Sequence, residues 1–177
     1  MVHSARHRET THASQLFGRA RELADLRERV RARERLISIV GPAGVGKTRL
    51  LLELSRSAPP AQRGALEVVG EGPGQRHRPA LVVAAPSPLF CDLSAARSAA
   101  DVVFRLARSL EVELSPMPNA ETTHVLAEAI ENRARVLLID NVEQVVSELG
   151  VLVGALLELA PTATFVLTSR VPAALPA

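Results

Sequence analysis

Nine consecutive residues, Gly41–Arg49 (GPAGVGKTR), have the types and spacing of a loop that binds a phosphate group. They satisfy the pattern G-x-x-x-x-G-K-[ST], in which small residues let successive backbone N–H groups point at one anion. Lys47 would reach the terminal phosphates of a nucleotide, and Thr48 would offer its hydroxyl to Mg²⁺. The pattern therefore predicts an ATP or ADP site with Mg²⁺. The residues expected to hold the nucleotide here are Gly41, Pro42, Ala43, Gly44, Val45, Gly46, Lys47, Thr48 and Arg49.

Lys47 is also the only lysine among the 21 basic residues of the chain. Such a bias indicates that arginine is used wherever a positive charge is sufficient. A lysine that persists against this bias marks a position where a compact ammonium group is needed and a planar guanidinium would not serve. We therefore expect Lys47 to be a catalytic residue of the phosphate site.

A second candidate metal-binding residue is Asp140, which follows the apolar run Val136–Ile139. A carboxylate at the end of a neighbouring strand can support Mg²⁺ directly or through a bound water, although Asp140 could also cap the next helix. The next residue is Asn141, and an amide orients water but cannot accept its proton. Hydrolysis should therefore be slow, unless Glu143 or a residue from elsewhere acts as the base; otherwise Glu143 is a solvated residue of the first helical turn.

Ser169 and Arg170 directly follow the apolar run Thr164–Thr168. In a parallel sheet the carboxyl ends of the strands form the edge that binds ligands. A guanidinium at that edge would sense the γ-phosphate, and the alternative is an ordinary surface arginine. We therefore predict a catalytic set of Lys47, Asp140 and Arg170, with Thr48 and Asp140 as the metal-directed pair.

The elements that must position these residues alternate along the chain. Short runs that are apolar throughout are typical of strands buried on both faces, and residues with helical periodicity separate them. This alternation predicts an α/β fold in which helices cover both faces of a parallel sheet. The expected strands are 36–40, 80–85, 89–91, 136–139 and 164–168, and Asp92 lies at the end of the third of these. The expected helices are 19–33, 47–57, 98–110, 121–133 and 142–159.

Composition is that of a single cytoplasmic domain. The chain has 177 residues, 47% of them hydrophobic, a formal net charge of +2 and one cysteine, which excludes an internal disulfide. The amino terminus lacks the apolar core of a signal peptide, and no run is long enough to span a membrane, so we expect no membrane association. We expect a disordered segment 1–14, a nucleotide-binding domain over 15–177, and an atypical loop or insertion at 58–88 that is rich in proline and glycine.

The amino-terminal region is basic, since residues 1–35 contain nine arginines and five acidic residues. Leu23, Leu26 and Val30 form the apolar stripe of the helix expected at 19–33, and the arginines lie on its outer face. This face is either simply solvated or a contact for a phosphate backbone. No aromatic residue is interleaved for stacking on bases, so direct DNA binding is the less favoured hypothesis.

Five segments in order resemble the STAND class of signalling ATPases, in particular the NB-ARC-like, AAA-like module of LuxR-type and AfsR-type bacterial transcriptional regulators. This resemblance covers residues 15–172 and implies a nucleotide-dependent switch in signal transduction and transcription regulation. It also places Gly18 and Arg19 near the adenine. The segments are Leu16–Leu23 (family pattern FVGRExEL), Gly41–Arg49 (GPxGVGKTRL, the Walker A loop), Phe90–Leu93 (FVDL), Val136–Val145 (LLVLDNxEHV, the Walker B strand) and Leu167–Pro172 (ATSRxP).

The chain departs from this family pattern in the segment 58–88 and after the last matching strand. In the family a fifth strand, a helical lid and a winged-helix domain follow, whereas this sequence ends at Ala177. The family's strand order would then leave the strand 36–40 at an exposed edge of the sheet, with a risk of self-association. We therefore expect a switch module that works with a partner regulator or as a homo-oligomer. The alternatives are an interaction or DNA-binding accessory and an inactive, truncated remnant.

Overall fold

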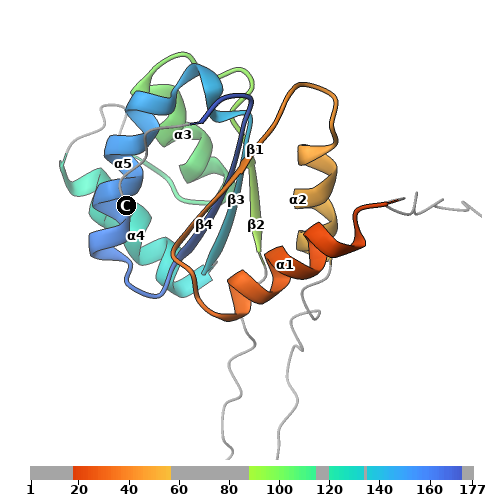
Figure 1. Ribbon diagram of the computed structural model, residues 1–177. Coiled ribbons are helices and arrows are strands. Elements are labelled where there is room, and N and C mark those ends of the chain that lie inside the picture. The colour runs from red at the N-terminus through yellow and green to blue at the C-terminus, as the bar shows by residue number, and fades with distance from the viewer. Residues whose placement is uncertain (1–17, 57–87, 115–119, 134, 173–177) are drawn as a thin grey trace, which may run out of the picture.

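A computed structural model describes residues 18–56, 88–114, 120–133 and 135–172, and Figure 1 shows how they are arranged. One four-stranded sheet lies in the middle, with α1 and α2 on one face and α3, α4 and α5 on the other. The predicted α/β fold is therefore confirmed. The expected disordered segment 1–14, the expected strand 80–85 and nearly all of the insertion 58–88 lie outside the described residues.

The strands are β1 (Leu36–Val40), β2 (Leu89–Asp92), β3 (Val136–Asp140) and β4 (Thr164–Ser169). They pair in the order β1-β4-β3-β2, and every pairing is parallel. All four carboxyl ends therefore lie at the same edge of the sheet. In this register Asp92 lies opposite Asp140 on the neighbouring strand, and Val40 lies opposite Ser169.

Strand β1 is an outer strand of the described sheet, as the strand order of the resemblance predicts. It pairs with β4 on one side only, and Val40 is 46% exposed. Backbone N–H and C=O groups along such an edge are available to another strand, which is the usual hazard of an edge strand.

The sheet alternates its side chains between two cores. On β3, Leu137 and Ile139 point into the core formed with α3, α4 and α5, and Leu138 points into the core formed with α1 and α2. This alternation is the period of two that a strand imposes. A strand whose side chains are apolar on both faces must be covered by helices on both faces of the sheet. The apolar runs in the sequence therefore predicted a sheet between two layers of helices.

The helices are α1 (Ala20–Arg31), α2 (Lys47–Arg56), α3 (Ala99–Ser109), α4 (Ala120–Arg133) and α5 (Val146–Leu159). Helix α1 ends earlier than the predicted boundary at Arg33, because Arg33 has a φ of 58°, outside the helical region. Ser98 caps α3 by accepting a hydrogen bond from the backbone N–H of Asp101. No helix within the described ranges has the length and apolar character needed to cross a bilayer.

The prediction of one helix over 142–159 was wrong in one respect. A short 3₁₀ turn, η1 (Val142–Gln144), comes first, and α5 begins only at Val146. Val145 separates the two with a φ of −134°, and its N–H donates to the carbonyl of Val142 three residues back. Val142 and Val145 are both fully buried, so the apolar stripe continues through the break although the α-helix does not.

Candidate functional site

The predicted phosphate loop follows β1 and leads directly into α2, which begins at Lys47. Gly44 and Gly46 have φ values of 77° and 88°, a backbone region that side-chain-bearing residues rarely adopt, so these positions require glycine. At the other end of the loop, the N–H of Gly41 donates to the carbonyl of Ser169 at 3.2 Å. This bond ties the start of the loop to the end of β4, where Arg170 follows.

Lys47 lies folded back over its own loop. Its Nζ donates to the carbonyl oxygens of Gly41 at 2.7 Å and Pro42 at 3.0 Å. An ammonium group has three donors, so one remains for a further acceptor. The loop's own carbonyls therefore fix the position of the positive charge beside the cavity.

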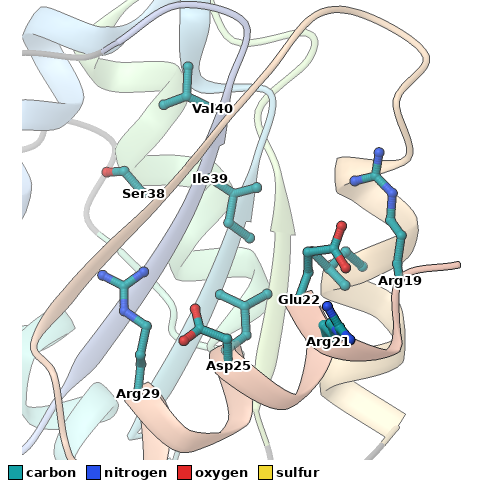
Figure 2. A pocket seen from close by; sticks show the side chains of 10 residues that line it. Arg19, Arg21, Glu22, Asp25, Arg29, Ser38, Ile39 and Val40 are labelled. Atoms are coloured by element: carbon teal, nitrogen blue, oxygen red, sulfur yellow. The ribbon is translucent and has the colours of Figure 1, made fainter.

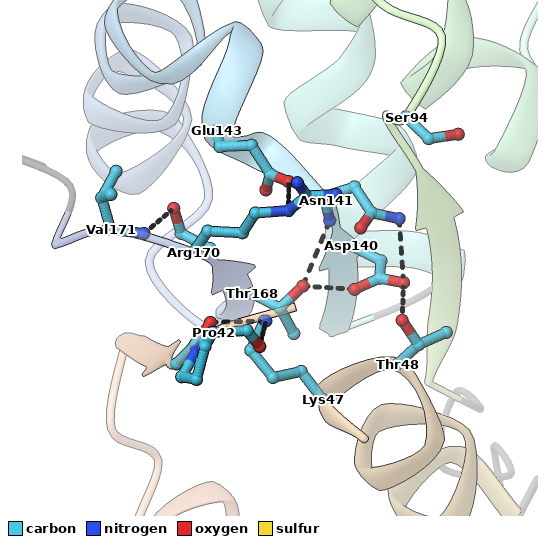
Figure 3. A network of polar contacts seen from close by, with 12 residues as sticks. Pro42, Lys47, Thr48, Ser94, Asp140, Asn141, Glu143, Thr168, Arg170 and Val171 are labelled. Atoms are coloured by element: carbon cyan, nitrogen blue, oxygen red, sulfur yellow. Dashed lines mark hydrogen bonds and ion pairs between the residues drawn. The ribbon is translucent and has the colours of Figure 1, made fainter. Parts of the chain in front are cut away.

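Asp140 is the centre of a polar network at the carboxyl ends of the strands (Figure 3). Its side chain accepts hydrogen bonds from the hydroxyl of Thr48, at 2.6 Å, and from the hydroxyl of Thr168. The carboxylate belongs to a residue that is only 1% exposed, so these donors compensate for its burial. Asp140 does not cap the following turn, because its bonds are directed to Thr48, Thr168 and the side chain of Asn141.

Asn141 links this network to β2. Its Nδ2 donates to Oδ1 of Asp92 at 3.0 Å and to Oδ2 of Asp140 at 3.2 Å. Partial burial acts to raise the pKa of Asp92, but hydrogen bonds from the backbone and hydroxyl of Ser94 and from the Asn141 amide outweigh it, and the pKa falls below its usual value. Asp92 is therefore held as a carboxylate.

Arg170 lies across the carboxyl end of β4, and its Nε donates to Oε1 of Glu143 at 2.8 Å (Figure 3). The side chain of Glu143 is only 16% exposed, and its other oxygen, Oε2, is buried with no hydrogen-bond partner among the residues that the structure describes. Glu143 is thus not the solvated first-turn residue that one sequence interpretation expected. It is a half-satisfied carboxylate whose partner is Arg170.

A cavity of about 350 Å³ brings many of the predicted site residues together, whereas Asp140 is buried beneath it and contacts it through Thr48 and Asn141. The loop, the start of α2 and the ends of β3 and β4 all contribute to its wall. Lys47 and Thr48 therefore share one space with Arg170, although more than 120 residues separate them in sequence. The residues around it are Ala43, Gly44, Gly46, Lys47, Thr48, Arg49, Leu52, Asn141 and Arg170.

Gly18 and Arg19 lie elsewhere, at the amino end of α1. Arg19 lines a second cavity of about 480 Å³ between α1 and the outer side of β1, together with Ser38, Ile39 and Val40 (Figure 2). Helix α2 contributes Leu50 to this cavity and other residues to the phosphate cavity. The structure thus does not bring Arg19 into the phosphate cavity.

Three contacts of the site were not predicted from the sequence. They are the Thr168 hydroxyl on Asp140, the Asp92 carboxylate on Asn141, and the Glu143 carboxylate on Arg170. The only sequence signal for them was that polar residues end several of the apolar runs. Their partners depend on the strand order and register, which the sequence pattern does not give.

Comparison with solved structures bears on the fold of the chain. The fold is similar to the crystal structure of Cdc6p from Pyrobaculum aerophilum, with a TM-score of 0.58 and 15% identity over 92% of this chain. The chain spans 41% of that protein's length. A structure of Pif1 helicases on forked duplex DNA has a TM-score of 0.43, with 11% identity, 85% of this chain covered and 33% of that one.

No curated protein matches the chain. The AAA ATPase domain family, however, matches residues 15–168. This match includes the phosphate loop, Asp140, strands β1 to β3 and all of β4 except its last residue, Ser169. With its parallel sheet, glycine-dependent loop and shared cavity, the chain belongs to the AAA ATPase domain family, a group of P-loop nucleotide-binding domains.

Proposed function

We propose that this chain is a Mg²⁺-dependent ATP/ADP-binding switch of the STAND type, in which the bound nucleotide rather than rapid turnover is the output. The observation that carries the proposal is the 2.6 Å contact between Thr48 and Asp140 beside Lys47 and Arg170. The order of the five sequence segments supports the STAND assignment. The proposal includes a cytoplasmic location, which the composition favours, and a partner regulator or second copy of the chain, which the resemblance favours.

The donor set fits Mg²⁺. Thr48 supplies a hydroxyl oxygen and Asp140 a carboxylate oxygen, and Mg²⁺ prefers hard oxygen ligands while retaining several waters. Thr48 would hold the ion, with Asp140 holding it directly or through one of these waters. When bound, the ion bridges phosphate oxygens and neutralises their charge.

The loop residues from Gly41 to Thr48, with Arg49, would surround the phosphates through backbone N–H groups and the positive end of α2. Lys47 would direct its remaining donor to them. Following the resemblance, the adenine would lie near Gly18 and Arg19. The ion pairs of Arg29 with Glu34 and of Arg31 with Glu28 balance part of the positive charge on α1, which makes the DNA-binding alternative less attractive.

The direct test is an equilibrium titration of the purified chain with ATP and with ADP, each with and without Mg²⁺. We expect saturable binding of both nucleotides, with Mg²⁺ increasing the affinity for ATP more than for ADP because it bridges the β- and γ-phosphates. A folded chain that binds neither nucleotide would contradict the proposal. Salt-sensitive binding to duplex DNA without any effect of nucleotide would favour the accessory alternative instead.

Arg170 gives a second prediction, because a γ-phosphate and Glu143 would compete for the same guanidinium. Arg170→Ala should lower ATP affinity about 5- to 10-fold and leave ADP affinity nearly unchanged. This is less than a full charge-assisted hydrogen bond contributes, because the Arg170 side chain is 60% exposed and must give up Glu143 to bind the phosphate. Glu143→Gln should do the opposite and raise ATP affinity, because it removes the competing carboxylate. The same titrations measure both.

These opposite directions are the control for the Arg170 prediction. A general loss of structure would weaken ATP and ADP binding together in both variants. If Arg170→Ala reduced both affinities equally, the γ-phosphate role would be wrong and Arg170 would instead be structural.

A further inference from the structure

Asn141 is held from two neighbouring strands and from its own backbone. Its Nδ2 faces the carboxylates of Asp92 and Asp140, and its N–H donates to the hydroxyl of Thr168 at 3.1 Å. Carboxylates only accept hydrogen bonds, so the amide must turn its nitrogen toward them. Its Oδ1, which no hydrogen bond within the described part of the chain reaches, is then left for the cavity that Asn141 lines.

The backbone of Asn141 is equally constrained. Its φ of 60° and ψ of 51° are left-handed, a region in which asparagine is enriched several-fold among residues other than glycine. Asparagine at this position therefore satisfies two demands at once, the backbone angle and a donor for two carboxylates. A glutamate here would fit neither.

Asp92 is itself fixed in place. Its Oδ1 accepts from the backbone N–H of Ser94 and its Oδ2 from the Ser94 hydroxyl, both at 2.8 Å. The carbonyl of Asp92 accepts from Nη1 of Arg105 at 3.1 Å. Asp92 is not among the residues that line the phosphate cavity, so it reaches that cavity only through Asn141.

We propose that Asp92 is a positioning residue that orients the Asn141 amide so that Oδ1 accepts a hydrogen bond from the water attacking the γ-phosphate. This inference rests on the proposed function. In the reaction, the water oxygen bonds to the γ-phosphorus, and the bond to the bridging oxygen breaks with its electron pair staying on ADP. One water proton stays on the released phosphate and the other passes to solvent. Because an amide accepts no proton, the site orients the water without activating it.

The carboxylate of Asp92 and the position that would face the phosphate, that of Asn141, are separate in this site. The carboxylate is at the end of β2 and the amide is on the residue that follows β3, although Asp92 and Asp140 are already neighbours in register. An acid at position 141 would add a third carboxylate to this pair, and like charges placed together oppose ionisation. Exchanging the side chains of Asp92 and Asn141 would keep the number of charges and the hydrogen bond between the two positions. The exchange would place the carboxylate at position 141, beside the cavity.

The experiment measures single-turnover hydrolysis, with the chain in excess over radiolabelled Mg-ATP, beside ATP affinity by titration. Asp92→Ala should lower the rate about 10-fold with less than a twofold change in affinity, as should Asn141→Ala, and the double variant should be no slower than either single. Asp92→Asn keeps an acceptor and should stay within about threefold of the original rate. The exchange variant Asp92→Asn with Asn141→Asp should exceed the original rate about 100-fold, the lower end of what a general base contributes.

The matched control is Asp101→Asn. It removes a carboxylate from the first turn of α3, and Asp101 bonds to Ser98 and Arg97 and not to Asn141. Rates unchanged in Asp92→Ala, together with no gain in the exchange variant, would overturn the inference while leaving ATP binding, and thus the proposed function, intact.

A second readout needs no nucleotide. The side-chain NH₂ signals of Asn141 in a ¹H–¹⁵N spectrum, assigned by their loss in Asn141→Asp, should shift in Asp92→Ala and stay in place in Asp101→Asn. If the chain bound no ATP, the proposed function would fail and these signals alone would decide whether Asp92 positions Asn141. If the Asn141 signals did not shift in Asp92→Ala, the positioning role would be wrong whatever the nucleotide data show.

Discussion

Lys47→Ala should lower ATP affinity at least about 10- to 100-fold while the chain stays folded, which amounts to loss of detectable binding at micromolar nucleotide. The size follows from losing charge-assisted hydrogen bonds to phosphate, worth about 1.5–3 kcal/mol each, at about 1.4 kcal/mol per tenfold in affinity. Lys47 is only partly buried and its present partners are the loop carbonyls of Gly41 and Pro42. Titration with ATP measures the affinity, and circular dichroism measures whether the variant stays folded.

Lys47→Arg is the informative companion. It keeps the charge, yet it should recover little of the affinity, because a planar, forked guanidinium cannot occupy the place of a compact ammonium between two loop carbonyls. Arg31→Ala removes one charge from the far end of α1, at an exposed pair with Glu28, and should bind like the original chain. Unchanged affinity in Lys47→Ala would show that the loop is not the nucleotide site.

The strands and the loop could be predicted because their signals are local. The run Leu36–Val40 ends at Gly41, and the observed β1 has those same bounds. The loop is defined by the spacing of its glycines, Lys47 and Thr48, and the observed α2 begins where that pattern requires. Backbone preference and side-chain period decide such features within about ten residues, so a single sequence contains them.

The break before α5 could not be predicted from the same kind of signal. Val142 and Val145 are three residues apart, a spacing that both an α-helix and a 3₁₀ turn place on one face. The apolar stripe therefore continues whether or not the helix does. What distinguishes the two is the left-handed backbone of Asn141, which its contacts with Asp92 and Thr168 help to hold.

The ion pair between Glu143 and Arg170 is a second feature that could not be predicted from the sequence. A glutamate in the first turn after a strand is typically solvated and stabilised by the helix dipole. Here the end of β4 carries Arg170 over it, and the side chain becomes largely buried. The strand order β1-β4-β3-β2 places β4 next to β3, and no pattern within either segment specifies that neighbour.

Asp140→Asn should remove the effect of Mg²⁺ on ATP affinity, so that the ratio of affinities with and without the ion falls below about twofold. The substitution removes the carboxylate charge that Mg²⁺ prefers but keeps the size and one acceptor of the side chain. It also leaves one hydroxyl donor, that of the exposed Thr48 or of the buried Thr168, without its acceptor. The free energy of unfolding without nucleotide should therefore fall by about 1–3 kcal/mol. Titrations with and without Mg²⁺, and urea denaturation, measure the two effects.

Thr168→Val separates the metal effect from the structural one. It removes the hydroxyl that donates to Asp140 and accepts from the Asn141 N–H, so it should also lower the free energy of unfolding. The carboxylate and Thr48 remain, so the dependence of ATP binding on Mg²⁺ should persist. Loss of the Mg²⁺ dependence in Asp140→Asn alone would assign the metal-directed charge to Asp140. If both variants lost the Mg²⁺ dependence equally, Asp140 would instead act by supporting the edge of the sheet.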